Sequence, residues 1–240
     1  MASENEVWIM RGLDWDDPYR IRSWQELISW INEVGFLPLF KNEIPGFSAE
    51  EHVSPLFWWT GDPLQDPWIW RELIAKSGLV AYGKFFNRKA GFISKEWFPY
   101  LVNYRRDGYD FDARWEDELA SLRSKKIMDQ FEGQKEYLSG ELKKAAGYGK
   151  GGEKNFDGEV TLLQMQTYLT IKEFRRKKNK KGEEYGMASS VYCMPEQLWG
   201  RDAVVSAYEE EPAASWEKIC MQIKKHFPDA SEAQIRHVLK

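Results

Sequence analysis

Two glutamines, Gln164 and Gln166, have the type and spacing that could do chemistry together. A glutamine amide both donates and accepts hydrogen bonds, so a pair could orient one bound ligand. On a strand the two side chains would share a face, whereas on a helix they diverge by about 200°. The surrounding pattern favours a helix, where Gln164 also fits a late capping box with Thr161 or is an ordinary surface glutamine.

The densest positive run of the chain follows directly. It comprises Lys172, Arg175, Arg176, Lys177, Lys178, Lys180 and Lys181. Residues 179–182 form a predicted hairpin turn, so the cations would lie on a β-hairpin. Such a hairpin supplies charge and donors to DNA phosphates without reading bases. The alternative is a solvated edge hairpin whose lysines prevent strand association. The charge density at the turn favours nucleic-acid contact, with double-stranded DNA as the expected partner.

A second candidate surface lies in the aromatic-rich first half. Its possible cleft residues are Trp58, Trp59, Trp68, Trp70, Tyr82, Lys84, Trp97, Arg105 and Arg106. Rings interleaved with cations can stack unpaired bases. The alternative is a hydrophobic core whose cations reach past it to solvent, which is the commoner use of such residues.

Composition limits the other possibilities. The net charge is −4, so nucleic-acid binding would rest on a local patch. The three histidines and the cysteines, Cys193 and Cys220, lack metal-ligand spacing, and the glycine-rich residues 147–152 lack the P-loop pattern. We therefore expect no metal and no cofactor. No apolar run approaches the roughly 20 residues that span a bilayer, so we expect a cytoplasmic protein without a membrane partner.

The elements that must position these side chains follow the order of a winged helix-turn-helix. Residues 138–148 are predicted as one helix, and residues 158–169 as a second helix capped by Asp157. Two strands around the basic turn follow. The second helix is the expected recognition element, whose polar face would meet the major groove. The predicted fold class is α+β, mainly α, with winged helix-turn-helix units and two β-hairpins.

The first half has clear start and stop signals but no visible internal repeat. Ser23 and Glu26 form a capping box for a helix that ends at Gly35, and Asp66 opens another that ends at Gly78. Residues 79–94 are predicted as a hairpin with its turn at residues 87–91, and Asp112 as the cap of a later helix.

Four regions follow from these signals. We expect an N-terminal arm over 1–22, an aromatic-rich helical and hairpin domain over 23–133, a winged-helix unit with a basic wing over 134–200, and C-terminal helices over 201–240.

Three stretches resemble one bacterial protein family. They are PYRIRSWQELISWINEVGFLPLF, DPWIWRELIAKSGLVAYGKFFNRKAGFISKEWFPY, and the basic-hairpin stretch with its YGM…YCMPEQLWG ending. These stretches resemble the AlkZ-related proteins, which look like relatives of the AlkZ-type winged-helix DNA glycosylases. The resemblance implies a role in DNA repair, the excision of alkylated bases. It also implies a QxQ motif that holds the attacking water. Gln164 and Gln166 match that motif, although the family's own lies in an earlier helical unit.

Three functional hypotheses remain open. The first is a winged-helix DNA-binding protein related to DNA glycosylases, with catalysis not established. The second is an active DNA glycosylase that hydrolyses the N-glycosidic bond of alkylated bases, with Gln164 and Gln166 as catalytic residues. The third is a regulatory or protein-interaction module that does not bind DNA.

Overall fold

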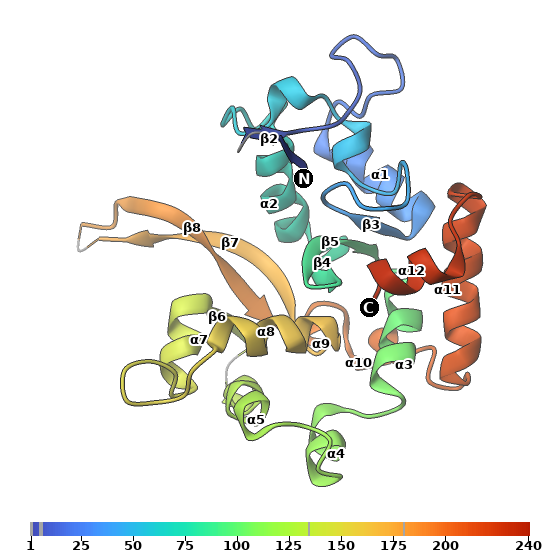
Figure 1. Cartoon of the computed structure of the whole chain (residues 1–240). Coiled ribbons are helices and arrows are strands. Elements are labelled where there is room, and N and C mark those ends of the chain that lie inside the picture. Colours follow the sequence, from blue (N-terminus) through green and yellow to red (C-terminus); the bar gives the residue numbers. More distant parts are fainter. Residues whose placement is uncertain (1, 5–6, 134, 180) are drawn as a thin grey trace.

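The computed structural model describes residues 2–4, 7–133, 135–179 and 181–240. Two three-stranded antiparallel sheets lie among helices (Figure 1), which confirms the predicted α+β class. A small antiparallel hairpin, β1 (Ala2–Glu4) and β2 (Val7–Ile9), precedes them. Residues 10–22 follow this hairpin, and the Ile21 N–H donates to the His52 carbonyl at 2.8 Å.

The first unit contains two α-helices, one short strand, two 3₁₀ turns and a hairpin. Its elements are α1 (Trp24–Val34), β3 (Phe36–Pro38), the 3₁₀ turns η1 (Glu50–His52) and η2 (Pro55–Phe57), α2 (Pro67–Ser77), β4 (Val80–Phe86) and β5 (Lys89–Ser94). The predicted caps are confirmed: Ser23 accepts from the Glu26 N–H, and Asp66 from the Trp68 N–H. The capping box itself is incomplete, because the Glu26 carboxylate accepts from the N–H of Arg22 and not from that of Ser23.

The hairpin of the first unit is shorter at its turn than predicted. Only Asn87 and Arg88 connect β4 to β5, with φ of 46° and 65°. Two successive positive φ angles define a turn whose twist matches the flanking strands, so residues 89–91 belong to β5 instead. The sheet order is β3-β5-β4.

Four helices connect the two units: α3 (Phe98–Arg106), α4 (Phe111–Glu116), α5 (Leu122–Met128) and α6 (Gln130–Gly133). The prediction that Asp112 caps a helix was wrong. Asp110 does so, accepting from the Ala113 N–H at 2.9 Å, and Asp112 lies in the first turn.

The second unit carries the glutamines and the basic run. Its elements are β6 (Glu136–Leu138), α7 (Ser139–Ala145), α8 (Phe156–Met165), β7 (Thr170–Lys178) and β8 (Glu184–Cys193), with sheet order β6-β8-β7. The predicted helix over 138–148 was wrong at its start, because Leu138 pairs with Val191 in β6. The predicted second helix is shifted: α8 begins after Asn155, which has φ of 66°, and ends at Met165.

The two units share one order of elements. The first unit reads α1, β3, the 3₁₀ turns, α2, β4, β5. The second reads β6, α7, α8, β7, β8, and the connecting helices α5 and α6 precede its first strand as α1 precedes β3. In both sheets the last strand lies between the first and the second. This repetition exists in the topology and not in the sequence, where the corresponding segments share no visible pattern.

Two clusters of buried side chains hold the chain together. The first cluster takes in the first unit together with the last two helices, α11 (Pro212–His226) and α12 (Glu232–Val238). The second cluster lies among α4 to α8. The short helices α9 (Pro195–Trp199) and α10 (Arg201–Val204) lead from β8 to α11. None of the described helices is long and apolar enough to cross a membrane.

Candidate nucleic-acid interface

The end of the β7–β8 hairpin stands away from the rest of the molecule (Figure 1). We call residues 175–179 and 181–187 the outer hairpin. Every residue in it whose exposure is described is exposed to solvent. The outer hairpin is therefore open to solvent wherever its exposure is described.

Two of the predicted DNA-binding cations are held within the protein. Glu136 on β6 accepts hydrogen bonds from Lys172 and Arg175, and Arg175 also pairs with Glu173. The bonds from Lys172 and Arg175 lower the pKa of Glu136, and the bond to Glu136 raises the pKa of Lys172. These two cations are already neutralised by carboxylates of the same sheet.

Three further cations lack such partners. Arg176, Lys177 and Lys181 are exposed, and no ion pair joins them to another described residue. The nearby Glu183 carboxylate accepts from the Asn179 amide at 2.8 Å. The predicted contacts Lys180 and the Lys178 side chain lie outside the described residues. Arg176, Lys177 and Lys181 thus remain without an ion pair to a described residue, although Glu183 and Glu184 also lie on the outer hairpin, whereas Lys172 and Arg175 are balanced.

The inner part of the hairpin is anchored on the first unit. Thr170 donates its hydroxyl to the Tyr82 carbonyl at 3.0 Å. The guanidinium of Arg71 on α2 lies between the rings of Trp68 and Phe174, at 3.7 and 4.2 Å from their centroids. Burial raises the pKa of Tyr82 to about 12, so this phenol stays neutral. Cation–π contacts of a buried arginine stabilise such an interface by roughly 2 kcal/mol.

The two glutamines of the QxQ sequence lie in different environments. Gln164 is 1% exposed, and its amide is engaged on both sides: the oxygen accepts from the Lys84 N–H at 3.0 Å, and the nitrogen donates to the Val160 carbonyl at 3.1 Å. Gln166 caps the C-terminus of α8 and is partly exposed. Gln164 therefore joins α8 to β4, and only Gln166 is open to solvent.

The exposed side of α8 carries negative charge. Asp157 and Glu159 occupy its first turn, and no basic residue follows in its last turn. The Glu159 carboxylate accepts from the hydroxyl of Ser124 at 2.9 Å. Carboxylates repel the phosphates that line both sides of the major groove. This helix is thus poorly suited to the groove contact that its place in the chain predicts.

The nine residues of the predicted aromatic cleft do not surround one cavity. Trp58, Trp70 and Tyr82 are buried in the first cluster, and Trp68 and Trp97 pack against it. Trp59 is 48% exposed, with its ring 6.4 Å from that of Trp68. These rings serve mainly as core, as the alternative interpretation predicts.

The three cations of that set have separate structural contacts. Lys84 is exposed beside Thr161, at 3.4 Å. Arg105 donates to the carbonyls of Phe85 and Leu239. Arg106, only 2% exposed, donates to both the hydroxyl and the carbonyl of Thr167 and pairs with Glu196. Arg106 thereby ties α3 to the segment after α8 and to α9.

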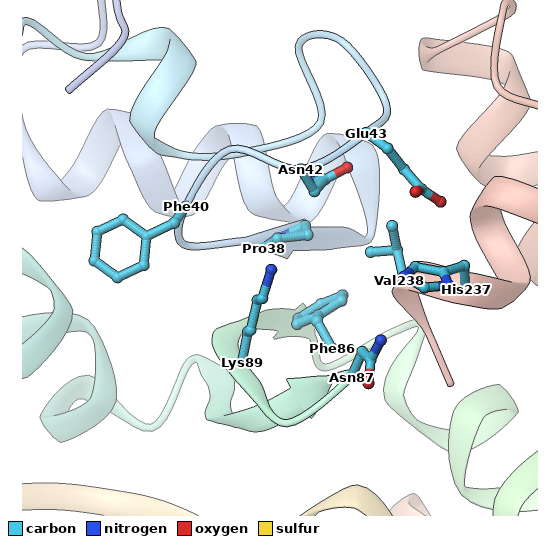
Figure 2. Close-up of a pocket in the computed structure, with 9 residues that line it drawn as sticks. All are labelled: Pro38, Phe40, Asn42, Glu43, Phe86, Asn87, Lys89, His237 and Val238. Atoms are coloured by element: carbon cyan, nitrogen blue, oxygen red, sulfur yellow. The ribbon is translucent and has the colours of Figure 1, made fainter. Parts of the chain in front are cut away.

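Two of the cavities among the described residues do not favour DNA phosphates, whereas a third, of about 540 Å³, is lined by Arg105, Arg236 and Lys240 without an Asp or Glu. The pocket drawn in Figure 2 is lined by the basic residues Lys89 and His237, but its volume is only about 80 Å³. Known small-molecule sites enclose at least roughly 300 Å³. A larger cavity of about 360 Å³ lies beside Arg106, but carboxylates outnumber cations in its lining. Among the described residues, no three His, Cys, Asp or Glu side chains converge as metal ligands.

Three contributors to this surface were missed by the sequence analysis. Glu136, Arg71 and Met187 became visible only through the pairing of β6 with β8, the packing of α2 on β7, and the path of β8. Residues 136–138 are too few to show the alternation that would reveal the strand carrying Glu136.

Comparison with known proteins gives one match. The model of a protein family described as AlkZ related matches residues 21–240, which is nearly the whole chain. No curated protein and no solved structure matches the chain significantly.

Proposed function

The chain belongs to the AlkZ-related family, and from this premise we propose that it binds double-stranded DNA through the outer hairpin. The family relates the chain to DNA glycosylase-like proteins. In this proposal the second unit is a winged helix, and the β7–β8 hairpin is its wing.

The topology of the second unit supports the winged-helix assignment. A helix and a short strand precede two helices, α7 and α8, and the following hairpin closes the sheet in the order β6-β8-β7. The same arrangement in the first unit makes two such units in the proposed fold.

The uncompensated charge of the outer hairpin is the observation that carries the proposal. Arg176, Lys177 and Lys181 have no acidic partner among the described residues, although the chain as a whole has a net charge of −4. Cations that release counterions from DNA account for most of the non-specific binding energy of DNA-binding proteins. A local basic ribbon on an acidic protein supports a contact with the phosphate backbone.

The exposed surface of α8 supports backbone contact over base reading. The commonest base-specific contacts in the major groove come from arginine, lysine or amide side chains on an accessible helix. On α8 the accessible first turn carries Asp157 and Glu159 instead. We therefore propose binding with little dependence on DNA sequence.

A salt titration of duplex binding tests the proposal. Affinity of the wild-type protein should fall linearly with log salt concentration, and the double variant Arg176→Ala/Lys177→Ala should have a shallower slope by about 2. Lys224→Ala/Lys225→Ala is the matched control, because it removes the same charge from exposed positions away from the hairpin, on helix α11. Absence of duplex binding at low salt would instead support the protein-interaction module.

Excision of alkylated bases is a second candidate, supported by the same family membership. Its test is the appearance of abasic sites when the protein is incubated with alkylated duplex DNA. Gln166, which is partly exposed, is the member of the QxQ pair whose amide could reach a substrate. An unchanged excision rate in Gln166→Ala would remove that residue from the mechanism.

A further inference from the structure

The return strand of the outer hairpin is irregular at one point. Arg175 pairs with Ser189, and Lys177 pairs with Tyr185. One residue of β7, Arg176, therefore faces three residues of β8, which are Gly186, Met187 and Ala188. Gly186 has φ of +72°, a conformation that glycine adopts without strain. The backbone of β8 bulges at this position.

The bulge places an apolar side chain in solvent. Met187 is 90% exposed, the highest value among the described large hydrophobic residues that are exposed, and Tyr185 two positions earlier is 51% exposed. Bulges commonly redirect a side chain near a functional site. A regular strand pairing would have placed residue 187 in the ladder opposite β7, where neighbours would cover part of it.

The surroundings of Met187 indicate which partner would cover it. Arg176 lies opposite the bulge and Lys177 lies opposite Tyr185, and both are exposed without an acidic partner among the described residues. A protein partner with an apolar groove would have to compensate these cations as well. A DNA duplex offers both features, because phosphates flank a stack of apolar base faces.

We propose that Met187 is a wedge that enters between two base pairs while Arg176 and Lys177 contact the flanking phosphates. This inference rests on the proposed DNA binding by the outer hairpin. Proteins that insert methionine or other apolar side chains at a base step unstack it partly and bend the duplex. Methionine suits this task because its unbranched, flexible side chain adapts to the gap that it enters.

The wedge defines a class of substrate. Unstacking one step costs a few kcal/mol in intact DNA and less where a base is mismatched, damaged or missing. A protein that must open a step therefore binds best where stacking is already weak. Met187 thus gives the basic hairpin a preference for duplexes with a weakened step, and the cations alone give none.

Paired binding measurements on two duplexes test the proposal. One duplex is fully paired and the other carries a single mismatch, each with 2-aminopurine beside the central step. The wild-type protein should bind the mismatched duplex about tenfold more tightly and raise the 2-aminopurine fluorescence, as expected when a few kcal/mol of unstacking are partly saved. In Met187→Ala the preference should fall below about twofold and the fluorescence rise should disappear. Its salt slope should stay that of the wild type, because no phosphate contact is lost.

Two control variants separate the wedge from general effects. Met187→Leu should keep most of the preference, since leucine is also an effective wedge. Met221→Ala removes another exposed methionine, 63% exposed on α11, and should change nothing. Equal binding of both duplexes by the wild type, or an undiminished preference in Met187→Ala, would overturn the wedge while leaving DNA binding by the hairpin intact. Failure of every variant to bind either duplex at low salt would overturn the proposed function itself, and the wedge with it.

Discussion

The β4–β5 and β7–β8 hairpins occupy equivalent places in two units of the same topology, yet they have opposite surroundings. All but one residue of β4 is buried, and its connection to β5 has only two residues. In β8 the first four residues are exposed, and the hairpin extends well beyond β6, the third strand of its sheet. The β4–β5 hairpin therefore serves as core, because other elements cover both of its faces. The β7–β8 hairpin is open to a partner, because its outer half lies beyond the core.

The first prediction tests how tightly the covered hairpin is packed. A Cβ at Gly91 would lie 2.4 Å from a Phe86 ring carbon and 2.7 Å from the Leu37 carbonyl oxygen. Gly91→Ala should lower the free energy of unfolding by about 3 kcal/mol, because the backbone of β3 cannot move aside easily. Chemical denaturation measures the effect.

Gly186→Ala in the exposed hairpin is the matched substitution. A Cβ there meets no atom within 4 Å, so its expected cost of about 1 kcal/mol comes from the positive φ alone. Equal destabilisation by the two variants would contradict the contrast between a packed and an open hairpin.

The second prediction concerns the junction between the two units. Gln164→Ala removes the acceptor of the Lys84 N–H on β4 and should lower the free energy of unfolding by about 2 kcal/mol. Gln166→Ala, at a partly exposed position, should change it by less than about 0.5 kcal/mol. Thermal unfolding of both variants measures the difference. A stable Gln164→Ala variant would mean that α8 and β4 hold together without this bond.

Local signals were enough to predict much of this fold. The helices opened by Ser23 and Asp66, the glycines that end them and the basic hairpin all follow from nearest-neighbour chemistry. The strand β6 did not, because its three residues form a strand only through pairing with residues 191–193. The repeated topology was equally hidden, since strand order depends on long-range pairing.

The sequence predicted where the positive charge of the candidate site lies, but not which of its side chains are paired or buried. The density of lysine and arginine over residues 172–181 located the basic hairpin. Which cations are neutralised depends on Glu136, which is distant in sequence from Lys172 and Arg175. The burial of Gln164 likewise depends on β4, which lies in the other unit. Periodicity carries no information about contacts of this kind.

The third prediction measures the contribution of the free cations. Arg176→Ala/Lys177→Ala should weaken duplex binding about tenfold at moderate salt, because two phosphate contacts are lost. In the covered hairpin, Arg88→Ala/Lys89→Ala removes two cations from exposed positions at the turn and beside it. That variant should change affinity by less than about twofold if the outer hairpin alone contacts the backbone. Fluorescence anisotropy with a labelled duplex distinguishes the two. Equal losses would show that both hairpins contact DNA.

The fourth prediction concerns the carboxylate that holds two cations of the exposed hairpin. Glu136→Gln should free Lys172, while Arg175 keeps its pair with Glu173, and should raise duplex affinity about threefold and steepen the salt slope by about 1. The hydrogen bonds to Lys172 and Arg175 lower the pKa of Glu136, so in the wild type the same gain should come only as pH falls through that lowered value. The stability that the bonds add is present above the unfolded-state pKa and is lost over the same acidic range.

Glu209→Gln is the control for this fourth variant, because it removes one negative charge at an exposed position that follows α10. A general relief of charge repulsion would raise affinity equally in both variants, whereas release of held cations raises it in Glu136→Gln alone. The second result would mean that a carboxylate of the same sheet limits DNA binding by the β7–β8 hairpin, since Glu136 neutralises Lys172 and shares Arg175 with Glu173.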